Sequence, residues 1–229
     1  MGEIKVILWD IDGTLLNFEE SEKVSIRKCF RMFGLGECTD EMLHAYSGIN
    51  RSYWERLERG EITKPEVLEG RFLDFFARYH IEISAAEFNR EYQLLLGDTA
   101  CFCPNGKESV TACRGKVKQY AVTNGTKMAQ EKKLKNSGLS DLLDGVFISE
   151  DIGVEKPATG FFEEVFRKIG DYKRSEVLIV GDSLTSDMLG GNTMGIVTCW
   201  YNPAGKEKNV PVKTDYEIRD LQQVPGLLG

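Results

Sequence analysis

Two aspartates separated by one residue, Asp10 and Asp12, follow an apolar stretch near the start of the chain. The stretch Ile4–Trp9 is apolar except for Lys5, as expected of a strand that is covered on both faces of a parallel sheet. Residues two apart in an extended chain point to the same side, and Gly13 then lets the chain turn sharply. Ligands of open α/β sheets bind at the carboxyl ends of strands, so this pair could do chemistry on one ligand; a solvated acidic turn is the alternative.

Three further groups follow later predicted strands. Thr123, Asn124 and Gly125 precede a predicted helix, where a hydroxyl and backbone N–H groups can bind an anion. Lys156, before Pro157, could supply a positive charge to the same anion. Taken singly, these residues also fit an ordinary turn and a solvated lysine.

A second acidic pair, Asp182 and Asp187, follows the predicted strand Val177–Val180. The two acids could hold a cation, or they could only cap the next helix. Several carboxylates gathered in one cleft repel one another and an anionic substrate, and a divalent cation would relieve that repulsion. Mg²⁺ suits a ligand set made only of oxygens, so the pattern favours a magnesium site.

Strands that alternate with helices indicate an α/β fold, here a doubly wound, Rossmann-like parallel sheet. The predicted strands are Ile4–Trp9, Val117–Thr123, Gly145–Ile148, Val177–Val180 and Ile196–Tyr201, and helical stretches lie near Lys127–Asn136, Gly160–Ile169 and Ser186–Gly190. Because the carboxyl ends of parallel strands share one edge, we expect the polar groups to converge there.

The 107 residues between Trp9 and Val117 exceed what a crossover helix needs, and their pattern is helical. Two apolar stripes with helical spacing comprise Ile26, Cys29, Phe30 and Phe33, and Leu68, Phe72, Phe75, Phe76 and Tyr79. Capping boxes are expected at Thr63-x-x-Glu66, Ser84-x-x-Glu87 and Asn105-x-x-Glu108. We therefore expect an all-helical domain at residues 17–98, inserted into a core domain of residues 1–16 and 99–229.

Composition narrows the possible partners and the compartment. The formal charge is −7, from 29 Lys and Arg against 36 Asp and Glu, with no basic block, which argues against binding to duplex nucleic acid. No apolar run approaches the roughly 20 residues of a membrane span, and the amino terminus is unlike an export signal. The six cysteines are accordingly expected to be reduced in a cytoplasmic protein, and Cys101, Cys103 and Cys113 lack the CxxC spacing of a metal site.

The order Asp10-x-Asp12-Gly13-Thr14, Thr123, Lys156-Pro157 and Gly181-Asp182…Asp187 resembles the four motifs of the haloacid dehalogenase superfamily of phosphohydrolases. The helical insert is similar to the helical C1 cap of one subgroup. Several strings further resemble the pyrimidine 5′-nucleotidase branch that acts on non-canonical nucleotides, namely Val122–Gly125, Gly153–Pro157, Gly181–Asp187 and Trp200–Pro203.

This resemblance implies a Mg²⁺-dependent phosphatase of small phosphorylated metabolites, such as a nucleotide or a sugar phosphate. Asp10 would be the nucleophile that forms an aspartyl-phosphate, and Asp12 the general acid and base. Lys156, Thr123 and the N–H groups of Asn124 and Gly125 would bind the phosphoryl oxygens.

The resemblance also implies a metal site and a cap that sets specificity. Asp10, the backbone carbonyl of Asp12 and Asp182 would hold Mg²⁺, and Asp187 would position Lys156 or a metal-bound water. Trp54 and Arg71 are candidates for contact with the substrate, although a place in the cap core would also explain them.

Two other functions fit the same motifs. One is a sugar-phosphate or phosphoglycolate-type phosphatase, or a phosphomutase. The other is a phosphatase-like binding protein without turnover, against which the full set of chemical residues argues. A dehalogenase is disfavoured, because dehalogenases of this superfamily expel halide and lack an acid at the position of Asp12.

Overall fold

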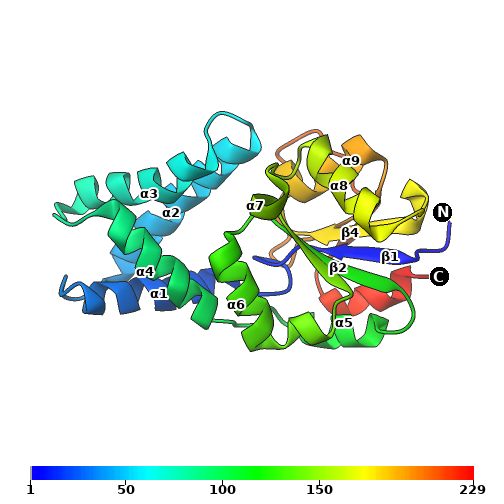
Figure 1. The fold of residues 1–229 in the computed structure, drawn as a ribbon, viewed down its shortest axis with the longest axis horizontal. Helices are drawn as coiled ribbons and strands as arrows, with labels where there is room; N and C mark the ends of the chain where they lie inside the picture. The colour runs from blue at the N-terminus through cyan, green and yellow to red at the C-terminus, as the bar shows by residue number, and fades with distance from the viewer. Residues whose placement is uncertain (1) are drawn as a thin grey trace.

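Six parallel strands form the centre of the protein, which the computed structural model describes for residues 2–229 (Figure 1). Their order across the sheet is β3-β2-β1-β4-β5-β6. The strands are β1 (Val6–Trp9), β2 (Lys118–Thr123), β3 (Gly145–Ile148), β4 (Val177–Gly181), β5 (Val197–Tyr201) and β6 (Tyr216–Ile218). The chain winds outward from β1 in both directions, which confirms the predicted doubly wound sheet.

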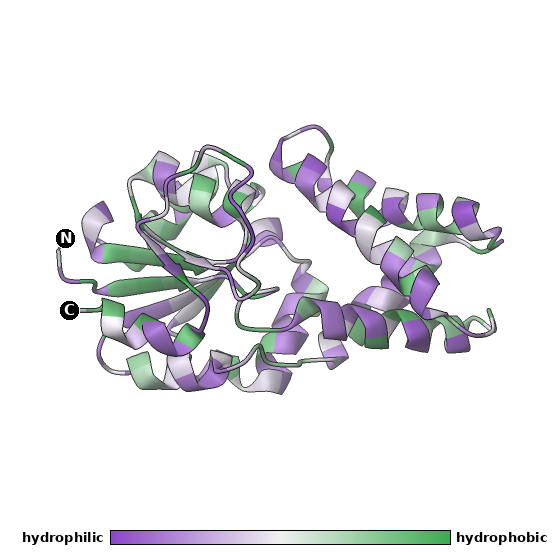
Figure 2. Ribbon diagram, turned by 180° about the vertical axis from the view of Figure 1, so that it is seen from behind, coloured by the Kyte–Doolittle hydropathy of each residue, from purple (hydrophilic) through white to green (hydrophobic). Residues whose placement is uncertain are grey.

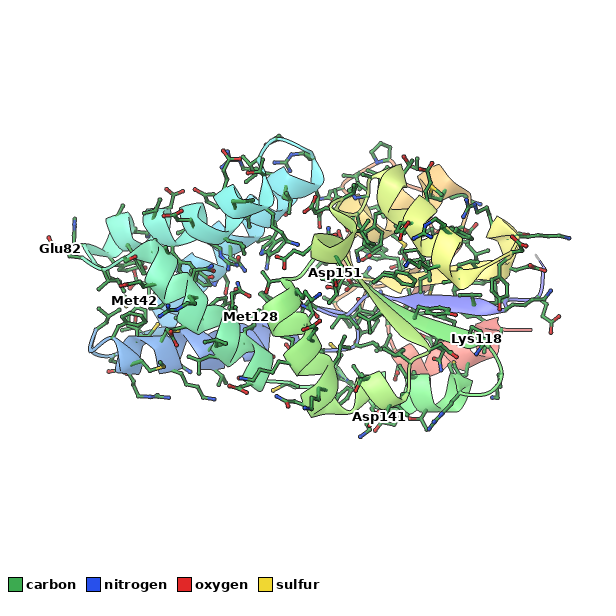
Figure 3. All side chains as sticks on the ribbon, viewed as in Figure 1. Met42, Glu82, Lys118, Met128, Asp141 and Asp151 are labelled. Atoms are coloured by element: carbon green, nitrogen blue, oxygen red, sulfur yellow. The ribbon has the colours of Figure 1, made fainter. Side chains whose placement is uncertain are left out.

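The register of the central strands brings their carboxyl ends together. Trp9 pairs with Ala121 of β2 and with Val180 of β4, and the N–H of Asp10 donates to the Val180 carbonyl at 2.9 Å. This edge faces a separate group of four helices. In Figure 3, Asp151 lies between the sheet and these helices, whereas Lys118, at the start of β2, lies at the opposite end of the sheet.

Helices cover both faces of the sheet. The helices α5 (Gly106–Cys113), α6 (Lys127–Ser137) and η4 (Leu221–Leu227) pack on one face, and α8 (Thr159–Ile169) and α9 (Leu189–Met194) pack on the other. The central strands β1 and β4 are correspondingly hydrophobic along their length (Figure 2). Short turns of helix complete the core, namely η1 (Leu139–Asp141), α7 (Ser149–Ile152), η2 (Arg174–Glu176) and η3 (Leu184–Met188).

Four helices lie between β1 and α5 in the sequence and beside the sheet in space (Figure 1). They are α1 (Phe18–Met32), α2 (Asp40–Glu58), α3 (Lys64–Tyr79) and α4 (Ala85–Asp98). Apart from Leu68, the residues of both predicted apolar stripes pack into one cluster. In this cluster Phe72 stacks on Tyr46 with ring centroids 5.1 Å apart. The four helices therefore carry an apolar core distinct from the two that flank the sheet.

All three predicted capping segments start helices, since α3, α4 and α5 begin directly after Thr63, Ser84 and Asn105. The Glu66 carboxylate accepts from the Thr63 N–H at 2.7 Å, and the Ser84 hydroxyl accepts from the Glu87 N–H at 3.2 Å. The helix predicted after Asn105 is confirmed, but α5 begins without a side-chain cap, because the Asn105 side chain donates instead to Asp220 at 3.0 Å.

Two elements differ from the sequence prediction. The sixth strand, β6, was not predicted, and the helix expected near Ser186–Gly190 spans η3 and α9 instead. All six cysteines are free, and five of them are buried. Within residues 2–229, no helix has the length and apolar character to cross a membrane.

Candidate active site

A buried ion pair lies at the carboxyl edge of the sheet. The carboxylate of Asp10, only 7% exposed, accepts from the Lys156 Nζ at 2.8 Å and from the Thr14 hydroxyl at 3.0 Å. The Lys156 Nζ also donates to Asp187 at 2.6 Å and to the Val122 carbonyl at 2.9 Å. All three N–H donors of the ammonium are engaged, so Lys156 fixes the orientation of the Asp10 carboxylate.

The second acidic pair, Asp182 and Asp187, lies beside Asp10 at the same edge. Asp187 is buried, whereas Asp182 keeps an exposed side chain. Gly13, with a φ of 94°, passes directly over Asp182, and a Cβ at this position would lie 2.7 Å from the Asp182 Oδ2. A glycine is therefore required at residue 13 both for the turn and for the approach of the two segments.

Burial and crowding shift the charges of these groups. Burial raises the pKa of Asp10 well above its usual range, against the opposing charge of Lys156 and with the charge of Asp187 adding to the rise. Loss of hydration raises the pKa of Asp182 to about 7, and Asp187 contributes again, although part of the Asp182 side chain stays open to solvent. Burial alone would lower the pKa of Lys156, but Asp10 and Asp187 outweigh it and hold that pKa above its ordinary value.

The donor set at this edge fits a divalent cation. Oxygens of Asp10, Asp182 and Asp187 lie within 4.8 Å of one another. Lys156 pairs with two of these three carboxylates, so the group keeps an excess of negative charge. This excess adds to the effect of burial in raising the pKa values of Asp10 and Asp182, and a hard cation with oxygen ligands such as Mg²⁺ would neutralise it.

The loop after β2 lies beside Lys156 and is tied to it. The Asn124 side chain accepts from the Lys156 N–H and donates to the Lys156 carbonyl, both at 2.8 Å. The Thr123 hydroxyl is buried and accepts from the Gly125 N–H at 3.0 Å. The structure thus brings Thr123, Asn124 and Gly125 together beside Lys156, with the Gly125 N–H donating to the Thr123 hydroxyl.

Asp12 occupies a different position from Asp10. Its carboxylate points to α6, where it accepts from the Lys133 Nζ and the Gln130 Nε2, both at 2.5 Å. Lys133 and Gln130 were not predicted as site residues. The sequence of α6 offers little signal for them, because its several lysines are typical of a solvated helix.

Of the two predicted cap residues, Arg71 makes its hydrogen bonds within the four-helix group. Arg71 is 1% exposed and donates to Asn50 at 2.7 Å and to Asn89 at 3.0 Å, inside the four-helix group. Asn50 in turn donates to the buried carboxylate of Glu22 at 2.7 Å. Trp54 is half-buried in α2. Arg71 is therefore part of a buried polar network here, and a contact of either residue with substrate stays a prediction.

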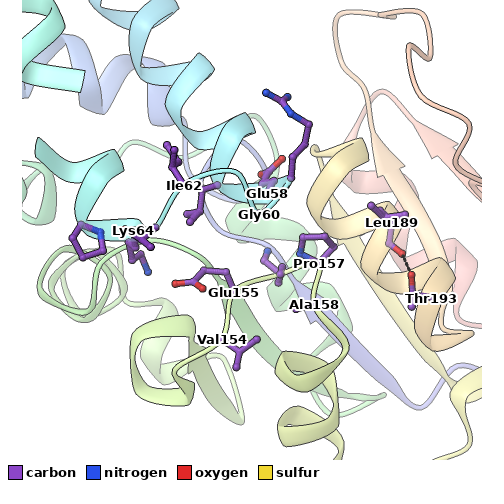
Figure 4. Close-up of a pocket in the computed structure, with 15 residues that line it drawn as sticks. Glu58, Gly60, Ile62, Lys64, Val154, Glu155, Pro157, Ala158, Leu189 and Thr193 are labelled. Atoms are coloured by element: carbon purple, nitrogen blue, oxygen red, sulfur yellow. Dashed lines mark hydrogen bonds between the residues drawn. The ribbon is translucent and has the colours of Figure 1, made fainter. Parts of the chain in front are cut away.

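The loop between α2 and α3 joins the four-helix group to the sheet edge at two points. Glu58, at the end of α2, accepts from the hydroxyls of Ser183 and Thr185 in the segment that follows β4. Lys64, at the start of α3, is buried and donates to the Ser149 hydroxyl at 2.8 Å and to the Gly125 carbonyl at 3.4 Å. A cavity of about 630 Å³ lies between this loop and residues 154–158, and Lys156 forms part of its lining (Figure 4).

Glu58 and Lys64 were also missed in the sequence. Each lies at a helix end, where a charged residue ordinarily faces solvent. Their hydrogen-bond partners are 61 to 127 residues away in the sequence. The one local signal is that both flank a single short loop, since polar residues on a loop beside a site commonly contact it.

Replacing Glu58 with glutamine is expected to stabilise the metal-free protein at alkaline pH. Burial raises the pKa of Glu58 to about 7, with Asp187 adding to the rise and the Thr185 hydroxyl opposing it. The folded protein therefore binds this proton more tightly than the unfolded chain does, so the charge costs stability above pH 7 and the cost vanishes as the pH falls below about 4.5. We expect Glu58→Gln to raise the free energy of unfolding by on the order of 2 kcal/mol at pH 8, measured by thermal melting with EDTA, and to change it little at pH 5.

Glu55→Gln is the matched control, because Glu55 lies one turn earlier in α2 and is exposed. It should leave the melting temperature unchanged at both pH values. A lower melting temperature for Glu58→Gln at pH 8 would contradict the assignment of a costly buried charge.

Comparisons with known proteins identify the family of the chain. A sequence model of the haloacid dehalogenase-like hydrolase family matches residues 4–195. The HAD-hydrolase YfnB of Bacillus subtilis is 32% identical over 228 residues, which cover 100% of this chain and 97% of YfnB. The pyrimidine 5′-nucleotidase PynA of Streptococcus pneumoniae is 30% identical, and the match covers 96% of this chain and 93% of PynA. The pyrimidine 5′-nucleotidase YjjG of Escherichia coli is 29% identical, and the match covers 97% of this chain and 96% of YjjG.

Solved structures show the same architecture. A crystal structure of YfnB bound to magnesium has a TM-score of 0.94 and 33% identity, and the match covers 100% of both chains. The L-2-haloacid dehalogenase of Xanthobacter autotrophicus has a TM-score of 0.79 at 15% identity over 98% of each chain, a likeness that concerns the fold alone. The resemblance found in the sequence is confirmed, and the chain belongs to the haloacid dehalogenase-like hydrolase family.

Proposed function

We propose that the protein is a Mg²⁺-dependent phosphatase of small phosphomonoesters, with pyrimidine nucleoside 5′-monophosphates as its preferred substrates. The convergence of Asp10, Lys156 and Asp182 at one edge of the sheet carries this proposal. A carboxylate, an ammonium and a site for a cation around one small space are what transfer of a phosphoryl group requires.

In the proposed reaction, a carboxylate oxygen of Asp10 attacks phosphorus while the bond from phosphorus to the leaving oxygen breaks. Asp12 gives its proton to that leaving oxygen. A water then attacks the aspartyl-phosphate, passes a proton to Asp12 and releases inorganic phosphate. Lys156 restrains Asp10, and Thr123 with the N–H groups of the adjoining loop binds phosphoryl oxygens.

Asp10, the backbone carbonyl of Asp12 and Asp182 would hold the Mg²⁺, which neutralises charge on the phosphoryl group when bound. Asp187 supports this arrangement through its contact with Lys156. Asp12 favours a phosphatase over a dehalogenase, because expulsion of halide needs no proton donor.

The substrate preference rests on the four helices and on the relatives. We propose that residues 17–98 form a cap domain over the core of residues 1–16 and 99–229, and that the loop between α2 and α3 covers the site through Glu58 and Lys64. A match to two pyrimidine 5′-nucleotidases over more than nine-tenths of the chain includes this cap as well as the core.

The purified protein with Mg²⁺ is expected to release phosphate from uridine and cytidine 5′-monophosphates faster than from purine nucleotides, phosphoglycolate or sugar phosphates. Chelation by EDTA should lower the rate by about 10²-fold or more, because uncompensated charge would remain at the site. A phosphate assay over this panel, with and without EDTA, makes the measurement.

Excess Mg²⁺ should restore the rate, and Mg²⁺ alone should raise the melting temperature of the wild type. Asp182→Asn should lose both effects. Release that is equally fast in EDTA would refute the metal-dependent mechanism, and isomerised product without free phosphate would indicate a phosphomutase.

A further inference from the structure

Helix α6 presents two buried polar side chains to Asp12. Lys133 has 0% and Gln130 1% of its surface exposed. The Lys133 Nζ donates to the Asp12 Oδ1 and the Gln130 Nε2 donates to the Asp12 Oδ2, each at 2.5 Å. Both oxygens of one carboxylate are thus held by separate donors from successive turns of the same helix.

The burial of Lys133 needs a reason, because removing an ammonium from water is costly unless a partner compensates. Its carboxylate partner is Asp12, and its ammonium lies 5.3 Å from the centre of the Phe18 ring. Lys127 and Lys135 on the same helix are exposed. Burial of the Lys133 ammonium therefore costs solvation free energy that a surface lysine would not lose. This cost is consistent with a role for Lys133 in holding Asp12.

Gln130 connects this pair to the loop that follows β2. A Cβ on Gly125 would lie 2.1 Å from the Gln130 Nε2, so the absence of a side chain at residue 125 makes room for the amide. The other amide atom, Oε1, is buried and has no hydrogen-bond partner among the residues that the structure describes. The orientation of the Gln130 amide is thus fixed by its packing against Gly125, and not by hydrogen bonds to both of its polar atoms.

We propose that Lys133 and Gln130 are positioning residues that hold the carboxyl group of Asp12 where it exchanges a proton with the leaving oxygen. Held at both oxygens, the side chain is restrained in one orientation beside α6. Each oxygen keeps a second lone pair on which a proton can reside. This inference rests on the proposed function, in which Asp12 is the general acid.

The test compares two leaving groups in Lys133→Met, which keeps the length of the side chain and removes its charge. The alkoxide of uridine 5′-monophosphate needs a proton as it departs, whereas the phenolate of p-nitrophenyl phosphate departs without one. We expect kcat/KM for the nucleotide to fall by about 10- to 100-fold and for p-nitrophenyl phosphate by less than about 3-fold, with little change in KM.

Gln130→Met should show the same selectivity to a smaller degree, and Lys133→Arg should recover most of the nucleotide activity. Lys132→Met is the matched control, because Lys132 is the neighbouring residue and pairs with Asp98 at 2.7 Å. It should leave both rates unchanged.

Equal losses on both substrates, or no loss on either, would overturn the positioning role. Loss of activity together with a fall in melting temperature that Lys133→Arg does not rescue would also overturn it, since Lys133 would then only support the fold. If the wild type hydrolyses neither compound with Mg²⁺, the proposed function fails and this inference fails with it. If the wild type hydrolyses both compounds, the variants test the inference separately from the proposed function.

Discussion

Replacement of Asp10 by asparagine is expected to lower turnover by at least about 10⁴-fold, because the amide cannot form the aspartyl-phosphate. Uncatalysed hydrolysis of phosphate monoesters is among the slowest reactions known, and catalysis must lower its barrier by about 20 kcal/mol or more. In the proposed mechanism, in-line attack by the Asp10 carboxylate begins that process. Steady-state phosphate release by Asp10→Asn, with Mg²⁺ and each active substrate, measures the loss.

The same variant should fold normally. Burial raises the pKa of Asp10, so its charge costs stability, and asparagine removes the cost while keeping an acceptor for Thr14. A melting temperature equal to or above that of the wild type would therefore accompany the loss of activity.

Trapping of the intermediate supplies the decisive control. Wild-type protein quenched in acid during turnover should carry a phosphoryl group that hydroxylamine removes, located by mass spectrometry on the peptide with Asp10. Residual turnover of Asp10→Asn within tenfold of the wild type would contradict the nucleophile assignment.

The sequence predicted the sheet and the convergence at its edge for one physical reason. Parallel strands expose all their carboxyl ends on one edge, so Asp10, Thr123 and Asp182 were expected at the same edge. The structure adds that their strands β2, β1 and β4 are direct neighbours. Buried strands such as VILW and VLIV also have little alternative to a sheet covered on both faces.

What the sequence did not show depends on contacts between distant residues. Lys133 and Gln130 reach Asp12 across more than 110 residues, and nothing local distinguishes them from the exposed lysines of α6. Asn105 has the pattern of a cap, yet Asp220, 115 residues later, competes for its side chain. β6 has three residues, too few to show alternation, and it exists because β5 offers it an edge.

Replacement of Lys156 by methionine is expected to lower turnover by at least about 10³-fold and the free energy of unfolding by about 3–5 kcal/mol. The ammonium binds Asp10, Asp187 and the Val122 carbonyl, and its loss leaves two buried carboxylates without a counter-charge. Its raised pKa means that this stabilisation is complete below about pH 10 and is lost only at higher pH. Activity assays and denaturant unfolding of metal-free protein at pH 7.5 measure the two losses.

The pH dependence of the variant gives a second measure. Lys156 opposes the rise in the pKa of Asp10, so its removal should raise that pKa further. The folded state then binds a proton that the unfolded chain releases, and stability should recover as the pH falls from 8 toward 5.

A double variant separates catalysis from stability. Asp187→Asn added to Lys156→Met removes one of the two stranded charges, so it should regain about 1–2 kcal/mol of the lost stability. Turnover should stay low, because no ammonium remains to orient Asp10 and to neutralise phosphoryl oxygens. Recovery of turnover in step with stability would mean that Lys156 only maintains the fold at this edge, and the catalytic assignment would then have to be withdrawn.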